Sequence, residues 1–126
     1  MLAEKDFKIL VVDDFSVTRT ILINHLSKLG YKNTVEAENG FSALARLKSA
    51  FFDLVITDCN LSDMSGLDML KQIRSDSDLK HIPVLMVTSE DLQGNIITAI
   101  RAGLNDYIVR PFEEYTFKQK LEKIFV

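Results

Sequence analysis

Three aspartates stand at the ends of two apolar segments of this sequence. Asp13 and Asp14 directly follow the apolar run 7–12, and Asp58 follows the run 54–57. If these carboxylates meet, they repel one another, since two unit charges about 4 Å apart cost roughly 4 kcal/mol at an effective dielectric constant near 20. Either a cation neutralises them or one carboxyl group stays protonated. Carboxylate oxygens suit Mg²⁺, and an aspartate beside such a metal can attack a phosphoryl group.

Two further apolar runs end in residues that could hold the oxygens of a phosphoryl group. Thr88 follows the run 83–87, and Arg110 follows the run 107–109. A hydroxyl and a guanidinium can both donate hydrogen bonds to such oxygens. A single aspartate after a strand is usually a turn or helix-capping residue, but that explanation does not cover all four run ends together. We therefore predict one site that combines the aspartates with Thr88 and Arg110.

The apolar runs are typical of strands that are buried on both faces of a parallel sheet. We expect five such strands, at residues 7–12, 34–37, 54–57, 83–87 and 107–109. The segments between and after them have helical spacing of apolar residues. The expected helices lie at 17–29, 42–49, 67–73, 94–102 and 117–125.

The first expected helix carries signals for both of its ends and for its buried face. Ser16 precedes it as a candidate N-cap, and Gly30 follows it as the left-handed residue that ends a helix. Five apolar positions are expected to form one face against the sheet; they are Val17, Ile21, Leu22, Leu26 and Leu29. Gly103 is expected to stop the fourth helix in the same way as Gly30.

Five strand–helix pairs in alternation indicate a doubly wound α/β fold, with residues 1–126 as a single domain. In an open α/β sheet, ligands bind at the carboxyl ends of the strands, where the strand order reverses. The aspartates should therefore meet in space although they are far apart in sequence. Thr88 and Arg110 should lie beside them.

Composition narrows the classes of partner and location. The chain has 126 residues, of which 47% are hydrophobic and 26% charged, and its net charge of −3 disfavours nucleic acid or an anionic membrane as a partner. Cys59 is the single cysteine, so an intrachain disulfide is excluded, and two histidines do not make a zinc site. No apolar run approaches the roughly 18 residues of a membrane span. These features predict a cytoplasmic location.

Four segments together resemble the receiver domains of two-component response regulators, and among these the chemotaxis receivers. The segments are ILVVDDFSVTR, DLVITDCNLSDMSGLDML, PVLMVTSE and DYIVRPF. The resemblance covers nearly the whole chain. It implies a flavodoxin-like fold with a five-stranded parallel sheet in the order 2-1-3-4-5 and helices on both faces.

The resemblance also implies a role for each residue of the expected site. Asp58 would be the phospho-acceptor. The Mg²⁺ ligands would be Asp13, Asp14, Asp58 and, through its backbone carbonyl, Asn60. Thr88 would bond the phosphoryl group, and Tyr107 would be the aromatic switch that follows Thr88.

The same resemblance implies partners and an output surface. A histidine kinase would donate the phosphoryl group, and the chain would catalyse its own phosphorylation and dephosphorylation without being a turnover enzyme. The output surface would include Ile96, Tyr107 and Lys120, with the flagellar motor switch as one candidate partner. The peptide bond before Pro111 would be cis.

Three departures from the family pattern carry expectations of their own. Arg110 stands in the place of the family's lysine. Ser62 replaces the usual proline after the acceptor strand, so we expect the loop 60–66 to be more mobile. Leu92 and Gln93 occupy positions that are basic in the chemotaxis receivers that touch the motor, which argues against the motor as partner.

Three alternatives compete with a stand-alone switch. The chain could be a receiver domain cut from a longer response regulator with a separate output domain. An aspartyl-phosphate phosphotransferase would usually carry a second aspartate two residues after its nucleophile, where this chain has Asn60. A flavodoxin-like cofactor binder would share the fold, but the acidic loop 13–16 would repel a flavin phosphate.

Overall fold

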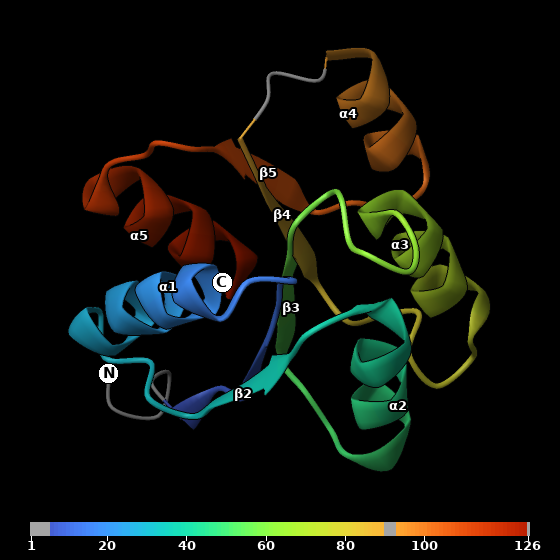
Figure 1. The fold of residues 1–126 in the computed structure, drawn as a ribbon, viewed down its shortest axis with the longest axis horizontal. Helices are drawn as coiled ribbons and strands as arrows, with labels where there is room; N and C mark the ends of the chain where they lie inside the picture. Colours follow the sequence, from blue (N-terminus) through green and yellow to red (C-terminus); the bar gives the residue numbers. More distant parts are fainter. Residues whose placement is uncertain (1–5, 90–92, 126) are drawn as a thin grey trace.

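The computed structural model describes residues 6–89 and 93–125. Its sheet has five parallel strands in the order β2-β1-β3-β4-β5, as expected (Figure 1). The strands are β1 (Ile9–Val12), β2 (Thr34–Ala37), β3 (Leu54–Thr57), β4 (Val84–Thr88) and β5 (Asp106–Val109). Strand order therefore reverses next to β1, and β1 and β3 lie at the centre of the ligand-binding edge.

Five helices cover the two faces of the sheet. They are α1 (Ser16–Lys28), α2 (Gly40–Ser49), α3 (Gly66–Ser75), α4 (Gln93–Arg101) and α5 (Glu114–Ile124). Figure 1 shows α1 and α5 on one face and α2, α3 and α4 on the other. This is the doubly wound α/β architecture that the alternation of strands and helices predicts.

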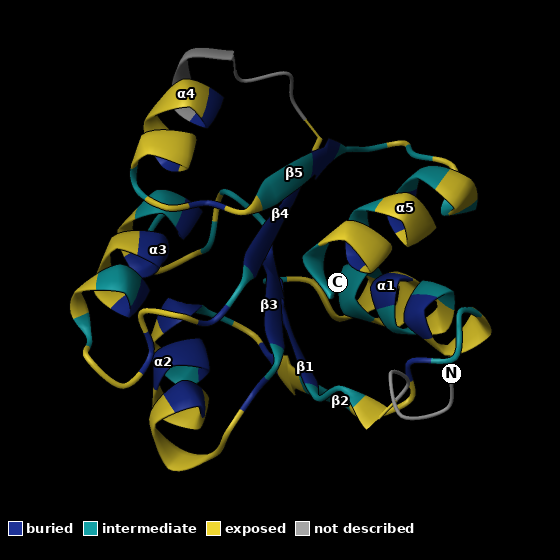
Figure 2. Cartoon of the chain, turned by 180° about the vertical axis from the view of Figure 1, so that it is seen from behind, coloured by how far each residue is buried: buried dark blue, intermediate teal, exposed yellow. Residues whose placement is uncertain are grey.

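The central strands are buried on both faces (Figure 2). Their successive side chains therefore belong alternately to two hydrophobic cores, one on each face of the sheet. On β1, Leu10 and Val12 pack with α2 and α3, whereas Ile9 and Val11 pack with α1 and α5. Burial on both faces explains why these strands appear in the sequence as continuous apolar runs.

The predicted strands and helices exist, with shifted boundaries. Strand β1 begins at Ile9, two residues later than expected, and β4 extends to Thr88. Gly30 and Gly103 follow α1 and α4 with φ angles of 98° and 104°, as the helix-stop prediction requires. The second helix begins at Gly40, two residues earlier than expected, and the third begins at Gly66, one residue earlier.

The predicted buried face of α1 is wrong in part. Val17 and Ile21 are 69% and 50% exposed, whereas Leu22 and Leu26 are buried. Residues 21 and 22 are consecutive and therefore about 100° apart around a helix, so the two stripes cannot both face the sheet. The sheet receives the stripe Leu22–Leu26–Leu29, and Leu29 packs against it partly buried.

The predicted N-cap of α1 is also wrong. Phe15 holds the N-cap position with no side-chain hydrogen bond, and Ser16 is the first helical residue. The carboxylate of Asp13 instead accepts a hydrogen bond from the Phe15 amide at 2.9 Å. The start of the helix is thus tied to a residue of the predicted site.

Pairing of the strands fixes which site residues become neighbours. Val12 is in register with Thr57, and the Asp58 amide donates to the Val12 carbonyl at 3.2 Å. Asp13 and Asp58 therefore leave the sheet side by side. We call this end of the sheet, where β1, β3 and β4 finish, the carboxyl edge. None of the helices in the described ranges is long and apolar enough to cross a lipid bilayer.

Candidate functional site

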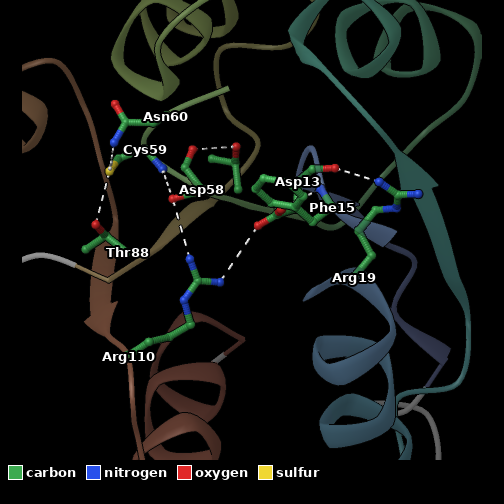
Figure 3. A network of polar contacts seen from close by, with 9 residues as sticks. Asp13, Phe15, Arg19, Asp58, Cys59, Asn60, Thr88 and Arg110 are labelled. Carbon is green, nitrogen blue, oxygen red and sulfur yellow. Dashed lines mark hydrogen bonds and ion pairs between the residues drawn. The ribbon is translucent and has the colours of Figure 1, made fainter. Parts of the chain in front are cut away.

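Arg110 connects two of the predicted aspartates at the carboxyl edge. Its Nη1 lies 3.8 Å from Asp13 Oδ2, and its Nη2 lies 3.8 Å from Asp58 Oδ1. Figure 3 shows the guanidinium reaching from the end of β5 to the space between the two carboxylates. The structure therefore brings Asp13, Asp58 and Arg110 together as the strand ends predicted, with a cation between the two carboxylates.

The two aspartates differ in accessibility. The side chain of Asp13 is 2% exposed and that of Asp58 is 18% exposed. Burial raises the pKa of Asp13, the nearby charges of Asp58 and Asp14 raise it further, and the Phe15 amide and Arg110 oppose this rise. Asp58 is thus the more accessible of the two carboxylates. Asp13 is an inner charge that a cation would stabilise.

Asp14 faces the loop after β3. Its Oδ1 accepts a hydrogen bond from the Ser62 backbone amide at 3.0 Å. The loop is also held internally, because Leu61 donates to the Met64 carbonyl at 3.2 Å and Asn60 pairs with Ser65 in an isolated bridge. The expectation of a looser loop at Ser62 overlooked this contact, which a proline could not make because it lacks the N–H.

Gly66 lets this loop return against the acceptor strand. Its amide donates to the Cys59 carbonyl at 2.8 Å, and a Cβ on Gly66 would lie 2.6 Å from the Asp58 carbonyl oxygen. A larger residue would push the start of α3 away from Asp58. The sequence does not reveal this requirement, since the close approach is to the backbone of Asp58, eight residues earlier.

The carboxylate oxygens of the acidic residues are suitable ligands for a divalent cation, but the side chains are not placed to coordinate one together. Across residues 6–89 and 93–125, no group of three or more His, Cys, Asp or Glu side chains is placed to hold a metal ion. Asp13, Asp14 and Asp58 nevertheless act on one another electrostatically, because the charges of the other two raise the pKa of Asp13. Hard carboxylate oxygens at one partly open edge fit Mg²⁺ chemically, with side-chain rotation needed to complete the ligand set.

Thr88 lies next to Cys59. The Cys59 sulfur and the Thr88 hydroxyl are 3.1 Å apart, and the Asn60 side-chain amide lies 3.5 Å from the same sulfur (Figure 3). The sequence analysis considered Cys59 only as the single cysteine of the chain. The signal available was its place directly after Asp58, just beyond the end of β3, whose sheet neighbour β4 ends in Thr88.

The backbone links the end of β4 to the end of β5. The Arg110 amide donates to the Thr88 carbonyl at 2.6 Å, and the Arg110–Pro111 peptide bond is cis, as expected. A change in the position of Thr88 is therefore passed directly to the residue that bridges the two aspartates.

The predicted output residues fall into two groups. Lys120 Nζ is 2.8 Å from Asp106 Oδ1 and lies 5.4 Å from the centre of the partly buried Tyr107 ring. Ile96 is 8% exposed and lines a cavity of about 210 Å³ together with Cys59, Asn60 and Met86. Tyr107 and Lys120 thus form one surface, while Ile96 faces inward beside the acceptor. Leu92 lies outside the described residues, as does the Gln93 side chain.

Sequence reasoning missed Arg19, which supports the site from α1. Its Nη1 donates to the Asp13 carbonyl at 2.7 Å (Figure 3). Its Nε donates to Glu36 Oε1 at 2.7 Å. Helical spacing could not reveal it, because Asp13 precedes α1 and Glu36 belongs to β2. Arg19 fixes the backbone that carries Asp13 and Asp14.

Comparisons with known proteins agree with this geometry. The family model of the response regulator receiver domain matches residues 9–122. Chemotaxis protein CheY-3 of Vibrio cholerae serotype O1 is 54% identical over 121 residues, covering 96% of this chain and 93% of that protein. Chemotaxis protein CheY of Pseudomonas aeruginosa is 51% identical over 118 residues, covering 94% of this chain and 95% of that protein.

Solved structures share the fold. Chemotaxis response regulator CheY4 of Vibrio cholerae is 31% identical with a TM-score of 0.85, covering 94% of this chain and 98% of that one. The receiver domain of a sensor histidine kinase from Pseudomonas aeruginosa PAO1, with a magnesium ion coordinated in its active site cleft, is 27% identical with a TM-score of 0.85. The match covers 95% of this chain and 98% of that receiver domain.

The matches span almost the whole chain, and the strand order is the one that the resemblance implied. The chain belongs to the response regulator receiver domain family, a family of signalling switches, and is closely related to the CheY chemotaxis proteins.

Proposed function

We propose that this chain, taken over residues 1–126 as one receiver domain, is a switch in which Asp58 accepts a phosphoryl group from a histidine kinase. The observation that carries the proposal is an accessible carboxylate beside a cation and a second, buried carboxylate. The Asp58 side chain is 18% exposed and lies 3.8 Å from Arg110 Nη2, whereas the Asp13 side chain is 2% exposed. Accessibility favours Asp58 over Asp13 as the nucleophile.

In the proposed transfer, a carboxylate oxygen of Asp58 bonds to phosphorus while the bond from phosphorus to the donor nitrogen breaks. The product is an aspartyl phosphate, and hydrolysis by water later returns the free carboxylate. Mg²⁺, when bound, supplies charge that stabilises the phosphoryl oxygens. We assign its binding to Asp13, Asp14, Asp58 and the backbone carbonyl of Asn60. Arg110 is already close enough to meet an oxygen of the product.

The proposed response begins at Thr88. A phosphoryl group on Asp58 would compete with the Cys59 sulfur for the Thr88 hydroxyl, which now lies 3.1 Å from that sulfur. Moving Thr88 acts on Arg110 through their backbone hydrogen bond and on Tyr107 through the pairing of β4 with β5. Phosphorylation would then shift the population of two conformations and change the surface formed by Tyr107 and Lys120.

The identity of the partners follows from the family and the relatives. A histidine kinase is the proposed donor, and the CheY relatives favour a chemotaxis output. The flagellar motor switch is one candidate target, and Leu92 and Gln93 are the residues that argue against it. We propose that the switch works in the cytoplasm, where a single free thiol such as Cys59 is compatible with the reducing conditions.

Intact-protein mass spectrometry tests the proposal. Wild type incubated with acetyl phosphate and Mg²⁺ should gain the mass of one phosphoryl group, and chelation of the metal should suppress that gain. Asp58→Ala should gain nothing, whereas Asp78→Ala, at an exposed aspartate away from the site, should behave as wild type. Persistent labelling of Asp58→Ala would refute the assignment of the acceptor.

A further inference from the structure

The loop between β3 and α3 is hydrogen-bonded on two sides to parts of the chain that are distant in sequence. On one side, the Ser62 backbone amide donates to Asp14 Oδ1 at 3.0 Å. On the other, the Asp63 carboxylate accepts from the backbone amides of Gly40 and Phe41, each at 2.8 Å. Consecutive residues of one loop therefore contact a residue of the proposed metal site and the first turn of α2.

The contact at Asp14 has a defined chemical consequence. A carboxylate offers about four lone-pair positions, so a donor on Oδ1 leaves Oδ2 able to bind a cation. Hydrogen bonds from neutral donors to a carboxylate are strong, and groups that hold a metal-binding carboxylate in place commonly change metal affinity 10- to 100-fold when they are removed. The Ser62 amide thus orients Asp14 without consuming its binding capacity.

The contact at Asp63 fixes where the Ser62 amide points. Desolvation alone would raise the pKa of Asp63, but donation by the backbone amides of Phe41, Gly40, Asp63 and Met64 together outweighs it and lowers that pKa. The loop also packs closely on α2, because a Cβ on Gly40 would lie 2.5 Å from Cγ of Met64. The amino end of α2 is therefore the support on which the loop rests, and anions are favoured at such an end.

We propose that the Ser62 backbone N–H is a positioning group for Mg²⁺ binding by Asp14, and that Asp63 transmits metal occupancy to the first turn of α2. This inference rests on the proposed function, since it takes the carboxyl edge to be a Mg²⁺ site. It assigns a positive role to Ser62, which stands where the family usually has a proline that could not donate this bond.

The decisive comparison is between two substitutions at the same position. Ser62→Pro removes the N–H, while Ser62→Ala removes only the hydroxyl and keeps the N–H. We expect Ser62→Pro to weaken Mg²⁺ binding about tenfold and Ser62→Ala to keep the affinity of wild type, as measured by calorimetric titration of the full chain with MgCl₂. Equal affinities in the two variants would overturn the proposal.

Asp63→Ala tests the second half without touching Ser62. It should weaken Mg²⁺ binding by about threefold, less than Ser62→Pro, because the amide remains but loses its support. In wild type, MgCl₂ should shift the NMR amide signals of Ser62, Gly40 and Phe41, and in Asp63→Ala the shifts at Gly40 and Phe41 should disappear. Shifts at Gly40 and Phe41 that persist in Asp63→Ala would refute transmission through Asp63.

The outcomes separate this proposal from the proposed function. If wild type binds no Mg²⁺, the metal site itself is wrong. If wild type binds Mg²⁺ but its Ser62 amide signal does not move, the positioning role is wrong while the switch stands. The wild-type measurement also decides the case in which Ser62→Pro does not fold, because it needs no variant.

Discussion

Two arginines at opposite ends of the sheet are held in contrasting ways. Arg74 of α3 lies at the amino edge, the end where β4 and β5 begin, and its guanidinium donates five hydrogen bonds of 2.7 to 3.0 Å. The acceptors are the carbonyls of Lys80, Ile82 and Gly103 and the side chain of Asn105. Arg110 at the carboxyl edge makes two ion pairs of 3.8 Å with carboxylates.

This difference indicates that the contacts of Arg74 are structural, whereas those of Arg110 can be exchanged for other partners. Backbone carbonyls at the amino edge cannot leave without unfolding a turn, and Gly103 is shaped to the arginine, since a Cβ there would lie 2.7 Å from Arg74 Nε. Desolvation lowers the pKa of Arg74, so its partners also compensate for partial burial. The long contacts of Arg110 leave both aspartates available to a metal ion or a phosphoryl group. One arginine thus stabilises the amino edge, whereas the other leaves the carboxyl edge open to ligands.

The largest expected effect comes from removing the contacts of Arg74 at the amino edge. Arg74→Ala leaves three carbonyls without this donor and removes one of the two donors to Asn105 Oδ1. It should lower the free energy of unfolding by about 3 kcal/mol, which corresponds to a fall of roughly 10 °C in Tm. Arg46→Ala, at an exposed position of α2, is the control. Thermal unfolding followed by circular dichroism measures both. Similar losses in the two variants would show that the Arg74 contacts contribute little.

Binding of Mg²⁺ at the carboxyl edge should give the next largest effect on stability. Mg²⁺ binds the folded acidic cluster and not the unfolded chain, so at a hundredfold excess over Kd it should add about 2.7 kcal/mol to the stability of wild type. Asp14→Ala should remove most of that gain and stabilise the metal-free protein by relieving repulsion. An unchanged Tm of wild type at millimolar Mg²⁺ would argue against a metal site.

Replacing Arg110 by lysine tests the comparison of the two edges further. It changes the shape of the loosely held side chain without removing its charge. Phosphorylation of Asp58 should survive, since Arg110→Lys leaves the nucleophile in place. Lysine is a compact point charge, whereas the guanidinium spans Asp13 and Asp58, so we expect coupling between phosphorylation and Tyr107 to strengthen by about 1 kcal/mol.

Dephosphorylation rate and the Tyr107 NMR response in both proteins measure this coupling. Identical values in wild type and Arg110→Lys would make the arginine an equivalent cation. Arg74→Lys, at the amino edge, serves as the matched substitution and should alter stability without altering that response.

Cys59 offers a smaller test of how loosely the carboxyl edge is held. Cys59→Ala removes the sulfur that lies 3.1 Å from the Thr88 hydroxyl, and should shift the switch toward its phosphorylated form by about 0.5 kcal/mol. Cys59→Ser keeps a hydrogen-bonding group there. NMR titration with beryllofluoride as a phosphate mimic reports the shift. Matching titrations of the alanine and serine variants would exclude a role for this contact.

The smallest effect concerns acid pH and the loop that borders the carboxyl edge. The pKa of Asp63 is lower in the folded protein than its ordinary value, because desolvation is outweighed by the backbone amides of Phe41, Gly40, Asp63 and Met64 together. Its contribution to stability is therefore present above the unfolded-state pKa and is lost as pH falls through the folded-state pKa. Asp63→Asn should make the fall in Tm between pH 5 and about pH 3 shallower, and Asp78→Asn should not.

The sequence alone supported the fold class and most of the site. Continuous apolar runs reveal strands buried on both faces, and parallel strands bring their carboxyl ends to one edge, so Asp13, Asp58, Thr88 and Arg110 could be grouped before any coordinates. The five-strand order came from the family resemblance. The buried face of α1 could not be settled by spacing, because two apolar stripes met the helical period and only packing against the sheet chose between them.

Tertiary structure decided the contacts that connect distant segments. The Ser62 amide reaches Asp14 across 48 residues, and Arg74 binds Asn105 across 31. Neither contact has a sequence pattern, because every residue except proline carries a backbone N–H and every residue carries a carbonyl. Which of these groups meets a given side chain depends on the path of the loops. The residue types determined what chemistry the edge could perform, and the folded chain determined which groups hold those residues in place.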